Sequence, residues 1–209
     1  MITIIEPKNY AYHRKDLTKM YSLRNKVFFE KLKWDVSSEH DLERDDYDER
    51  SAYYHVYKDQ DGVVRACHRM IPMTEDTLFD GPFSHTLPQK ELWKKPIYWE
   101  CSRFAIDPDL KSSRHEKGFR HITAEMFAAL MQFGMDYQVE YFLALMFPEM
   151  KRFMKTLGFL MVRLNEDKVG EEKVVTTAFS PSNYTFERLK KYLPETSPRF
   201  LWKTLNIAA

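Results

Sequence analysis

Arginines, carboxylates and aromatic rings recur at short spacings in the first half of this chain. Arg24 and Phe28 lie four residues apart, and Trp34 follows soon after. Aromatic faces attract a sulfonium or ammonium group, and a guanidinium binds a carboxylate through two parallel hydrogen bonds. The three residues therefore suit a ligand that carries both a cation and a carboxylate. The alternative is two core aromatics and a solvated arginine, because aromatic side chains are usually buried.

Two carboxylates, Asp45 and Asp48, stand in an acidic segment. Residues 31–50 contain eight acidic and four basic residues. Carboxylates accept hydrogen bonds from ribose hydroxyls, pair with arginine or hold an ammonium group. A run of charge is nevertheless in most proteins a solvated surface. Spacing alone does not separate the pair from the neighbouring acids Asp41, Glu43, Asp46 and Glu49.

Arg69 lies near the end of a short strand-like run, between Cys67 and Ile71. A buried arginine almost always has a partner of opposite charge, because an unpaired buried charge is costly. A solvated arginine at the surface fits the same sequence equally well.

The most strand-like stretch of the chain, residues 97–106, carries Glu100, Ser102 and Arg103. Residues three apart in a regular strand point to opposite faces of the sheet. Glu100 and Arg103 can therefore share one site only if a β-bulge lies between them, and we predict such a bulge. The alternative is an internal ion pair that spans a sheet edge.

The elements that position these residues follow from hydrophobic periodicity. Apolar steps of three and four residues predict helices, and short apolar or alternating runs predict strands. The Asp61-Gly62 pair is typical of a hairpin turn, and residues 31–50 and 74–95 are predicted as loop-rich, the latter a surface loop with one short helix. An α/β or α+β sandwich around one sheet follows. The predicted strands are 1–6, 52–58, 63–71, 97–106, 140–146, 159–164 and 173–179, and the predicted helices are 15–32, 122–137, 148–157 and 182–193.

Basic residues follow one another in two segments of the second half. The only charges from residue 150 to residue 164 are Lys151, Arg152, Lys155 and Arg163. With the basic loop Lys111, Arg114, Lys117 and Arg120 they would form a surface for an acidic partner or for phosphates. Ordinary solvation of a helix and a loop is the alternative.

Methionine is concentrated in the same half, since seven of the 11 methionines fall within residues 126–161. Methionine adapts to irregular apolar shapes and suits a pocket for a flexible acyl chain, although core packing explains the same pattern. The candidate lining residues are Met126, Leu145, Met146 and Phe147.

The composition narrows the class of protein. The formal net charge is +1, whereas nucleic-acid-binding domains are usually more basic. The two cysteines, Cys67 and Cys101, make neither a disulfide framework nor a zinc pattern, which favours a reducing cytoplasm. No run of apolar residues approaches the length of a membrane helix. We expect a cytoplasmic protein with no nucleic-acid partner and no membrane insertion.

The ordered set of charged and aromatic residues resembles the signature of the LuxI-type acyl-homoserine lactone synthases. The stretches Tyr21–Phe28 and Trp99–Phe104 resemble two hallmark segments of that family, and 150–159 resembles its later helix. The resemblance covers residues 1–192, nearly the whole chain. The eight matching positions are Arg24, Phe28, Trp34, Asp45, Asp48, Arg69, Glu100 and Arg103.

The resemblance implies an N-acetyltransferase-like three-layer sandwich with one mixed, mostly antiparallel sheet. It implies one domain over residues 1–209, with a variable tail at about 194–209. Family members join the amino group of S-adenosylmethionine to an acyl group from acyl carrier protein. Lactonisation then releases methylthioadenosine. S-adenosylmethionine is a co-substrate, so no cofactor and no metal are expected, and the donor is either acyl carrier protein or acyl-CoA.

The same resemblance distributes roles among the residues. Glu100 would act as the base, assisted by Ser102 and Arg103. The residues expected to bind S-adenosylmethionine are Arg24, Phe28, Trp34, Asp45, Asp48 and Arg69. The acyl pocket would be lined by Met126, Leu145, Met146 and Phe147, and Lys151, Arg152 and Lys155 would dock the carrier protein.

Two features depart from relatives and keep alternatives open. Gly118 stands alone in its basic loop, where acetyl-CoA enzymes carry a glycine-rich pyrophosphate loop. Many family members have Thr or Ser where this chain has Leu145, Met146 and Phe147, so we expect an unsubstituted acyl chain. The rival hypotheses are an acyl-CoA-dependent N-acyltransferase with another amine acceptor, and a non-catalytic module that binds S-adenosylmethionine or acyl carrier protein.

Overall fold

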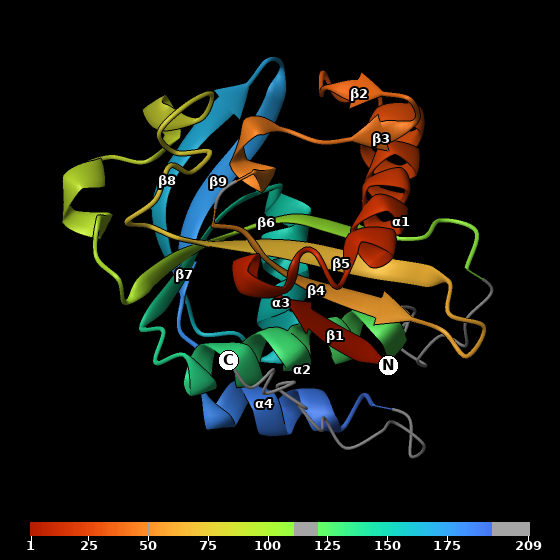
Figure 1. Cartoon of the computed structure of the whole chain (residues 1–209). Coiled ribbons are helices and arrows are strands. Elements are labelled where there is room, and N and C mark those ends of the chain that lie inside the picture. Colours follow the sequence, from red (N-terminus) through yellow and green to blue (C-terminus); the bar gives the residue numbers. More distant parts are fainter. Residues whose placement is uncertain (50, 111–120, 194–209) are drawn as a thin grey trace.

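A seven-stranded sheet organises the chain (Figure 1). The computed structural model describes residues 1–49, 51–110 and 121–193. Every neighbouring pair of its strands is antiparallel except β6 and β7, as expected for a mixed, mostly antiparallel sheet. The first strand, whose place the sequence left open, forms one edge. The strand order is β1 (Ile2–Ile5), β4 (Tyr53–Lys58), β5 (Val64–Pro72), β6 (Tyr98–Ile106), β7 (Tyr141–Met146), β9 (Glu172–Phe179) and β8 (Met161–Val169).

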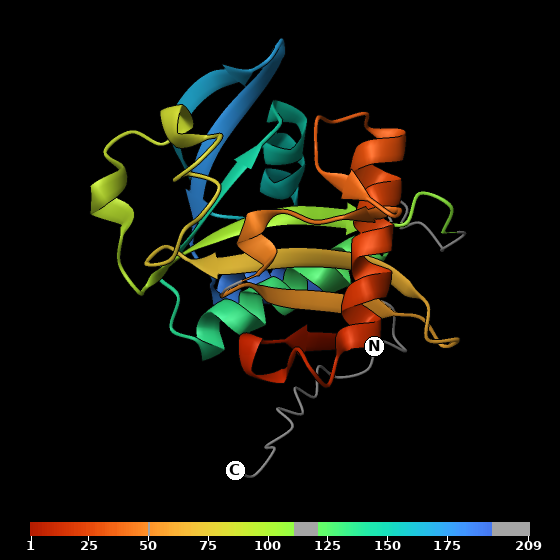
Figure 2. The ribbon, with the colours of Figure 1, turned by 45° about the horizontal axis from the view of Figure 1, so that its top comes forward.

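Helices cover both faces of this sheet. Figure 2 shows α1 (Arg14–Arg24) across one face of β4, β5 and β6, with α2 (His121–Asp136) and α4 (Asn183–Lys190) on the other. α3 (Pro148–Leu157) follows β7 and begins at a proline, which suits the first helical turn. Apolar residues of α1 pack with β4 and β5, and those of α2 pack with β6, β7 and β9. These two clusters are the core on either side of the sheet.

The first helix changes its hydrogen-bond pattern just before the aromatic residues. α1 continues into the π-helix η2 (Asn25–Lys31), so the predicted helix over 15–32 has nearly the right extent but only half of it is α-helical. The backbone N–H of Leu32 donates to the carbonyl of Val27 at 3.0 Å, and that of Trp34 donates to the carbonyl of Phe28 at 2.9 Å. π-helical turns are rare and occur frequently at functional sites. Here they turn the chain so that Trp34 returns over Phe28.

The segment between β5 and β6 corrects one expectation. The sequence predicted a surface loop over 74–95, yet Thr77, Leu78, Phe79 and Leu87 are buried. The segment contains two short 3₁₀ helices, η4 (Ser84–Thr86) and η5 (Lys90–Trp93), rather than one helix. Isolated apolar pairs have no helical or strand periodicity, so the sequence pattern did not reveal their burial. The segment covers the start of β6, where Glu100 lies.

The remaining elements agree with the predicted ranges. The Asp61-Gly62 turn joins β4 to β5, and Gly62 has a φ of +73°, which glycine adopts without strain. β8 extends beyond the predicted 159–164 to Val169 and forms a long hairpin with β9. In the described ranges no helix has both the length and the apolar character needed to span a bilayer. The basic loop 111–120 and the tail 194–209 lie outside the described residues.

Candidate functional site

The β-bulge expected in the strand of Glu100 is present, and it is centred on Arg103. β5 and β6 pair Arg69 with Ser102 and Cys67 with Ala105, so β6 has one extra residue between these pairs. Arg103 has a φ of 53°, a left-handed conformation that is strained for any residue but glycine. The bulge turns the Arg103 side chain toward the carboxylates beneath α1, on the side where Arg69 meets Ser102 and Glu100.

Arg24 and two carboxylates form a buried frame, by which we mean Arg24, Glu43 and Asp48. All three side chains are completely buried. Nη1 and Nη2 of Arg24 donate to the two oxygens of Asp48 at 2.8 Å each, and Nε donates to Glu43. The guanidinium therefore does fork a carboxylate, as predicted, but the carboxylate belongs to the protein.

Asp48 accepts hydrogen bonds from four residues. Besides Arg24, its Oδ1 accepts from Arg69 Nη1 at 3.0 Å and from the Tyr54 hydroxyl at 2.8 Å, and its Oδ2 accepts from the backbone N–H of Asp45 at 2.9 Å. Burial opposes the charged form, but the two arginines outweigh it and hold the pKa of Asp48 well below its ordinary value. Asp48 is thus an anchor for two arginines, with little capacity left for a ligand.

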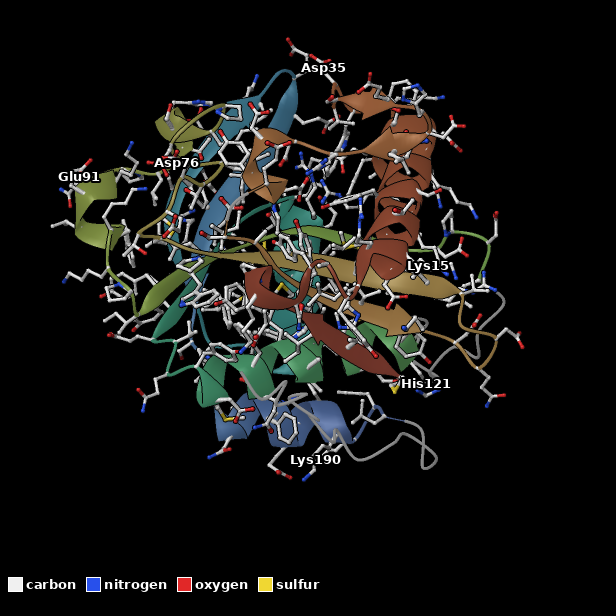
Figure 3. The ribbon with its side chains drawn as sticks, viewed as in Figure 1. Lys15, Asp35, Asp76, Glu91, His121 and Lys190 are labelled. Atoms are coloured by element: carbon white, nitrogen blue, oxygen red, sulfur yellow. The ribbon has the colours of Figure 1, made fainter. Side chains whose placement is uncertain are left out.

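Asp45 and Glu43 join the remaining arginines to this frame. Asp45 accepts from Arg69 through Oδ1 and from Arg103 Nη2 through Oδ2, the latter at 2.8 Å. Glu43 accepts from Arg103 Nε at 3.0 Å through the oxygen that Arg24 does not use. The four predicted charged clusters, drawn from α1, the acidic segment, β5 and β6, therefore converge. Figure 3 shows side chains crowded between α1 and the sheet in this region.

Glu100 lies at the bottom of the cluster and is almost fully buried. Its Oε2 accepts from the backbone N–H of Leu78 at 2.7 Å, while Oε1 makes no hydrogen bond within the described part of the chain. Arg69 Nη2 is likewise without a hydrogen bond there and lies 3.9 Å from that Oε1. Burial raises the pKa of Glu100, against the opposing charge of Arg69. A buried carboxylate with an unused oxygen and a raised pKa is a good proton acceptor.

Aromatic rings form the accessible side of the site. Phe28 and Trp34 are stacked, with ring centroids 5.0 Å apart. The Trp34 ring also packs against that of Phe147, with ring centroids 6.0 Å apart. The Arg103 guanidinium lies 5.7 Å from the Phe28 ring centroid. Phe28 is buried, whereas Trp34 is 37% exposed. Of these two rings, Trp34 is therefore the one open to a ligand, and Phe28 supports it from below.

Three of the four residues proposed for the acyl pocket pack in different clusters of the described chain. Met126 packs with Ala66 and Ile122, Leu145 packs in the separate cluster beneath the 74–95 segment, and Met146 borders the main core. Phe147 contacts another predicted site residue, Trp34. Because successive residues of a strand point to opposite faces, Leu145 and Met146 face opposite sides of the sheet. The expectation of one acyl pocket lined by all four residues stays a prediction.

A cavity of about 300 Å³ lies beside the site, between the acidic segment and the start of the 74–95 segment. One of its lining residues, Ile71, pairs with Glu100 across β5 and β6. Figure 3 shows another, Asp76, near β8, at the opposite end of the view from α1. The lining residues are Asp46, Tyr47, Ser51, Ile71, Glu75, Asp76 and Asp80.

The basic residues predicted to dock a partner lie on α3. Arg152 and Lys155 are exposed and Lys151 is partly exposed, and Arg152 pairs with Glu149 at 2.6 Å. Partial burial lowers the pKa of Lys151, and so do the nearby charges of Lys155 and Arg163. These three bases therefore lie close to one another. The other predicted bases, in 111–120, lie outside the described residues. Within the described residues, no group of three or more His, Cys, Asp or Glu side chains could hold a metal ion.

Sequence reasoning missed two members of the site, Glu43 and Tyr54. Glu43 was one of several equivalent acids, and only its complete burial distinguishes it. Tyr54 lies at an inward position of a predicted strand, where a tyrosine normally indicates core. A buried tyrosine hydroxyl needs a hydrogen-bond partner. The acids nearby in the sequence were therefore a signal that could have identified Tyr54 as a member of the site.

Comparison with known proteins places the chain in a family. The family model described as "Autoinducer synthase" matches residues 8–189. An acyl-homoserine-lactone synthase of Pseudomonas aeruginosa is 30% identical over 78% of this chain and 82% of that protein. The crystal structure of the AHL synthase LasI has a TM-score of 0.78 at 27% identity, covering 93% of this chain and 96% of that one.

The fold is shared with a further solved synthase. The CoA-dependent acyl-homoserine lactone synthase BjaI, solved with SAM and isopentyl-CoA, has a TM-score of 0.83 at 21% identity and covers 93% of this chain and 90% of that one. The N-acetyltransferase-like sandwich and the resemblance to the family are therefore confirmed. The chain belongs to the autoinducer synthase family, and its activity is the acyl transfer of an acyl-homoserine-lactone synthase.

Proposed function

We propose that the enzyme joins the amino group of S-adenosylmethionine to an acyl group delivered as a thioester, and then closes the lactone with release of methylthioadenosine. The net charge of the site carries this proposal. Its three guanidiniums face four carboxylates, which leaves an excess of one negative charge. S-adenosylmethionine has a sulfonium, an ammonium and a carboxylate, so its net charge is +1. The charged groups are Arg24, Arg69 and Arg103 against Glu43, Asp45, Asp48 and Glu100.

The unsatisfied groups of the site suggest how the substrate is held. Nη1 of Arg103 makes no hydrogen bond to any described residue, so it is suited to the substrate carboxylate. Oε1 of Glu100 is suited to the ammonium group. The sulfonium would lie against the exposed ring of Trp34, which stacks on Phe28. Arg24 and Asp48, which the sequence placed among the binding residues, act in this proposal by fixing Arg69 and the acidic segment.

The chemistry requires one base and good positioning. Glu100 takes a proton from the ammonium group, and the freed amine attacks the thioester carbonyl, with backbone donors of 98–105 facing the oxyanion. The carbon–sulfur bond of the thioester breaks and the thiol leaves, which completes the amide. A carboxylate oxygen of the substrate then attacks the carbon next to the sulfonium, and that second carbon–sulfur bond breaks. Methylthioadenosine departs as a neutral thioether, so positioning accounts for most of this step.

For the donor we propose acyl carrier protein, which is acidic, docked on the bases of α3. Lys151, Lys155 and Arg163 form a group of like charges, and neither lysine has an ion-pair partner in the described residues. Like-charged surfaces steer an oppositely charged partner to its site. Replacing both lysines by Glu should raise KM for acyl carrier protein by at least about tenfold and leave KM for acyl-CoA within about twofold. Equal effects on both donors would contradict docking at α3.

Donor and co-substrate can be tested together. The enzyme should consume S-adenosylmethionine only when an acyl thioester is supplied, and mass spectrometry of the organic extract should show an N-acyl homoserine lactone. Its mass identifies the acyl chain, and the reaction in which it forms identifies the donor. An acyl product with another amine and no methylthioadenosine would favour a plain N-acyltransferase. Tight binding of S-adenosylmethionine with no product from any donor would favour a non-catalytic module.

A further inference from the structure

We propose that Glu43 is a positioning residue that holds Arg103 in place for the carboxylate of the adenosyl substrate. The inference rests on the function proposed above and adds a residue to it. Glu43 is completely buried and each of its oxygens accepts from an arginine, so it has no free oxygen for the substrate. Its two oxygens accept from the Nε atoms of two different arginines, Arg24 on α1 and Arg103 on β6. It is thus the direct link between the first helix and the bulged strand.

Arg103 needs such a link because of its backbone. A left-handed conformation costs a non-glycine residue on the order of 1 to 3 kcal/mol and persists only where the surroundings impose it. Two carboxylates hold this side chain: Glu43 accepts from Nε at 3.0 Å, and Asp45 accepts from Nη2 at 2.8 Å. A guanidinium held at these two nitrogens can no longer rotate in its own plane. Its third nitrogen, Nη1, is therefore directed to one fixed place.

Glu43 also fixes the distance between the Arg103 guanidinium and the aromatic rings. The Arg103 guanidinium lies 5.7 Å from the centroid of Phe28, which stacks on Trp34. Asp45 alone would leave the guanidinium hinged about one nitrogen, because Asp45 is partly exposed and shared with Arg69. Glu43 is rigid in comparison, since Arg24 fixes its other oxygen and Asp48 in turn fixes Arg24.

The substitution Glu43→Gln tests this role with little change in volume. The amide oxygen can accept from one arginine, but the amide nitrogen then faces the other guanidinium, donor against donor. Arg24 retains two bonds to Asp48, so the weaker attachment, that of Arg103, is the one lost. The matched control is Glu6→Gln. Glu6 is also a buried carboxylate, and it pairs with Lys8 and Tyr137 away from the site.

The readout is calorimetric binding of two ligands, S-adenosylmethionine and methylthioadenosine, which lacks the amino-acid group. Glu43→Gln should weaken S-adenosylmethionine binding by at least about tenfold and change methylthioadenosine binding by less than about twofold, since only the former has a carboxylate for Arg103. KM for S-adenosylmethionine should rise more than kcat falls. Glu6→Gln should leave both affinities at the wild-type value. A smaller loss of the same selective kind is expected for Glu43→Asp, which serves if the glutamine variant does not fold.

Three results would overturn the inference while the proposed function stands. One is unchanged S-adenosylmethionine binding in Glu43→Gln. The second is an equal weakening of both ligands and the third is a loss of kcat alone, which are what a partly unfolded enzyme shows. A wild-type enzyme that does not bind S-adenosylmethionine would instead overturn the proposed function, and the role of Glu43 with it.

Discussion

At the scale of residues, some charged groups of the site stabilise the fold and others remain available to bind a ligand. Arg24 and Asp48 satisfy one another and have no exposed surface, whereas Glu100 and Arg69 keep one unsatisfied polar atom each. A buried polar group without a partner is costly, so such atoms mark the places where a ligand has something to gain. The proposed reaction uses the free oxygen of Glu100 and leaves the satisfied groups in place.

Replacing Glu100 by Gln removes the proposed base with almost no change in shape. We expect kcat to fall by at least about 100-fold, because a positioned base contributes about 10² to 10⁴ in rate. In the wild type, burial raises the pKa of Glu100 above its ordinary value of 4.5, and the base must be deprotonated to act. Activity should therefore fall with decreasing pH, with a midpoint above 4.5. A midpoint below that value, or an active Gln variant, would contradict the assignment.

Arg24→Lys tests the buried frame through stability. A lysine carries one nitrogen where arginine uses three, so Glu43 and Asp48 would lose bonds inside the protein. Breaking a buried ion pair on one side costs about 3 to 5 kcal/mol. Urea denaturation should show a decrease of this size in the free energy of unfolding. A decrease below about 1 kcal/mol would mean that the frame is not a stabilising unit.

At the scale of elements, the bulge in β6 was predictable and the pairing of the charges was not. Residues three apart in a regular strand point to opposite faces of the sheet, so Glu100 and Arg103 can share a site only if a bulge is present. That argument needs only their spacing. The partner of Arg24 depends on how the acidic segment folds back over α1, and eight acids were equivalent in sequence. The π-helix and the buried Leu78 leave no periodic signal. The acyl pocket stays a prediction, because methionine frequency does not distinguish a core from a cavity.

Gly81 shows how the 74–95 segment positions the site. A Cβ atom at this position would lie 2.0 Å from the Tyr47 hydroxyl oxygen, so Gly81→Ala must displace that ring. The Tyr47 ring lies 5.8 Å from the Arg69 guanidinium. We expect a folded enzyme whose KM for S-adenosylmethionine rises several-fold. Adding Tyr47→Phe removes the clashing oxygen and should restore most of the affinity, as double-variant kinetics would show. No rescue would mean that Tyr47 does not transmit the effect.

At the scale of the whole molecule, two histidines couple stability to pH. His55 and His68 are completely buried between the sheet and α2, with ring centroids 4.6 Å apart. Burial lowers the pKa of His68 to about 3, and burial together with His68 lowers that of His55. Between pH 6.5 and 3 the unfolded chain therefore binds a proton at His68 that the folded protein does not.

Because the unfolded state binds more protons in this range, stability must fall as the pH falls. One such histidine accounts for a loss of about 2 kcal/mol in the free energy of unfolding between pH 7 and pH 5. Urea titrations at these two values should show the loss, and His68→Phe should reduce it. If the variant keeps the whole pH dependence, His68 is not its source.

The central claim is that one pocket makes both bonds of the product from a single adenosyl substrate. The most direct test is the ratio of N-acyl homoserine lactone to methylthioadenosine, measured by mass spectrometry over one time course with an accepted donor. The two should appear together in a ratio of one to one, and Glu100→Gln should suppress both. Acylated product without methylthioadenosine, or methylthioadenosine without lactone, would contradict the account.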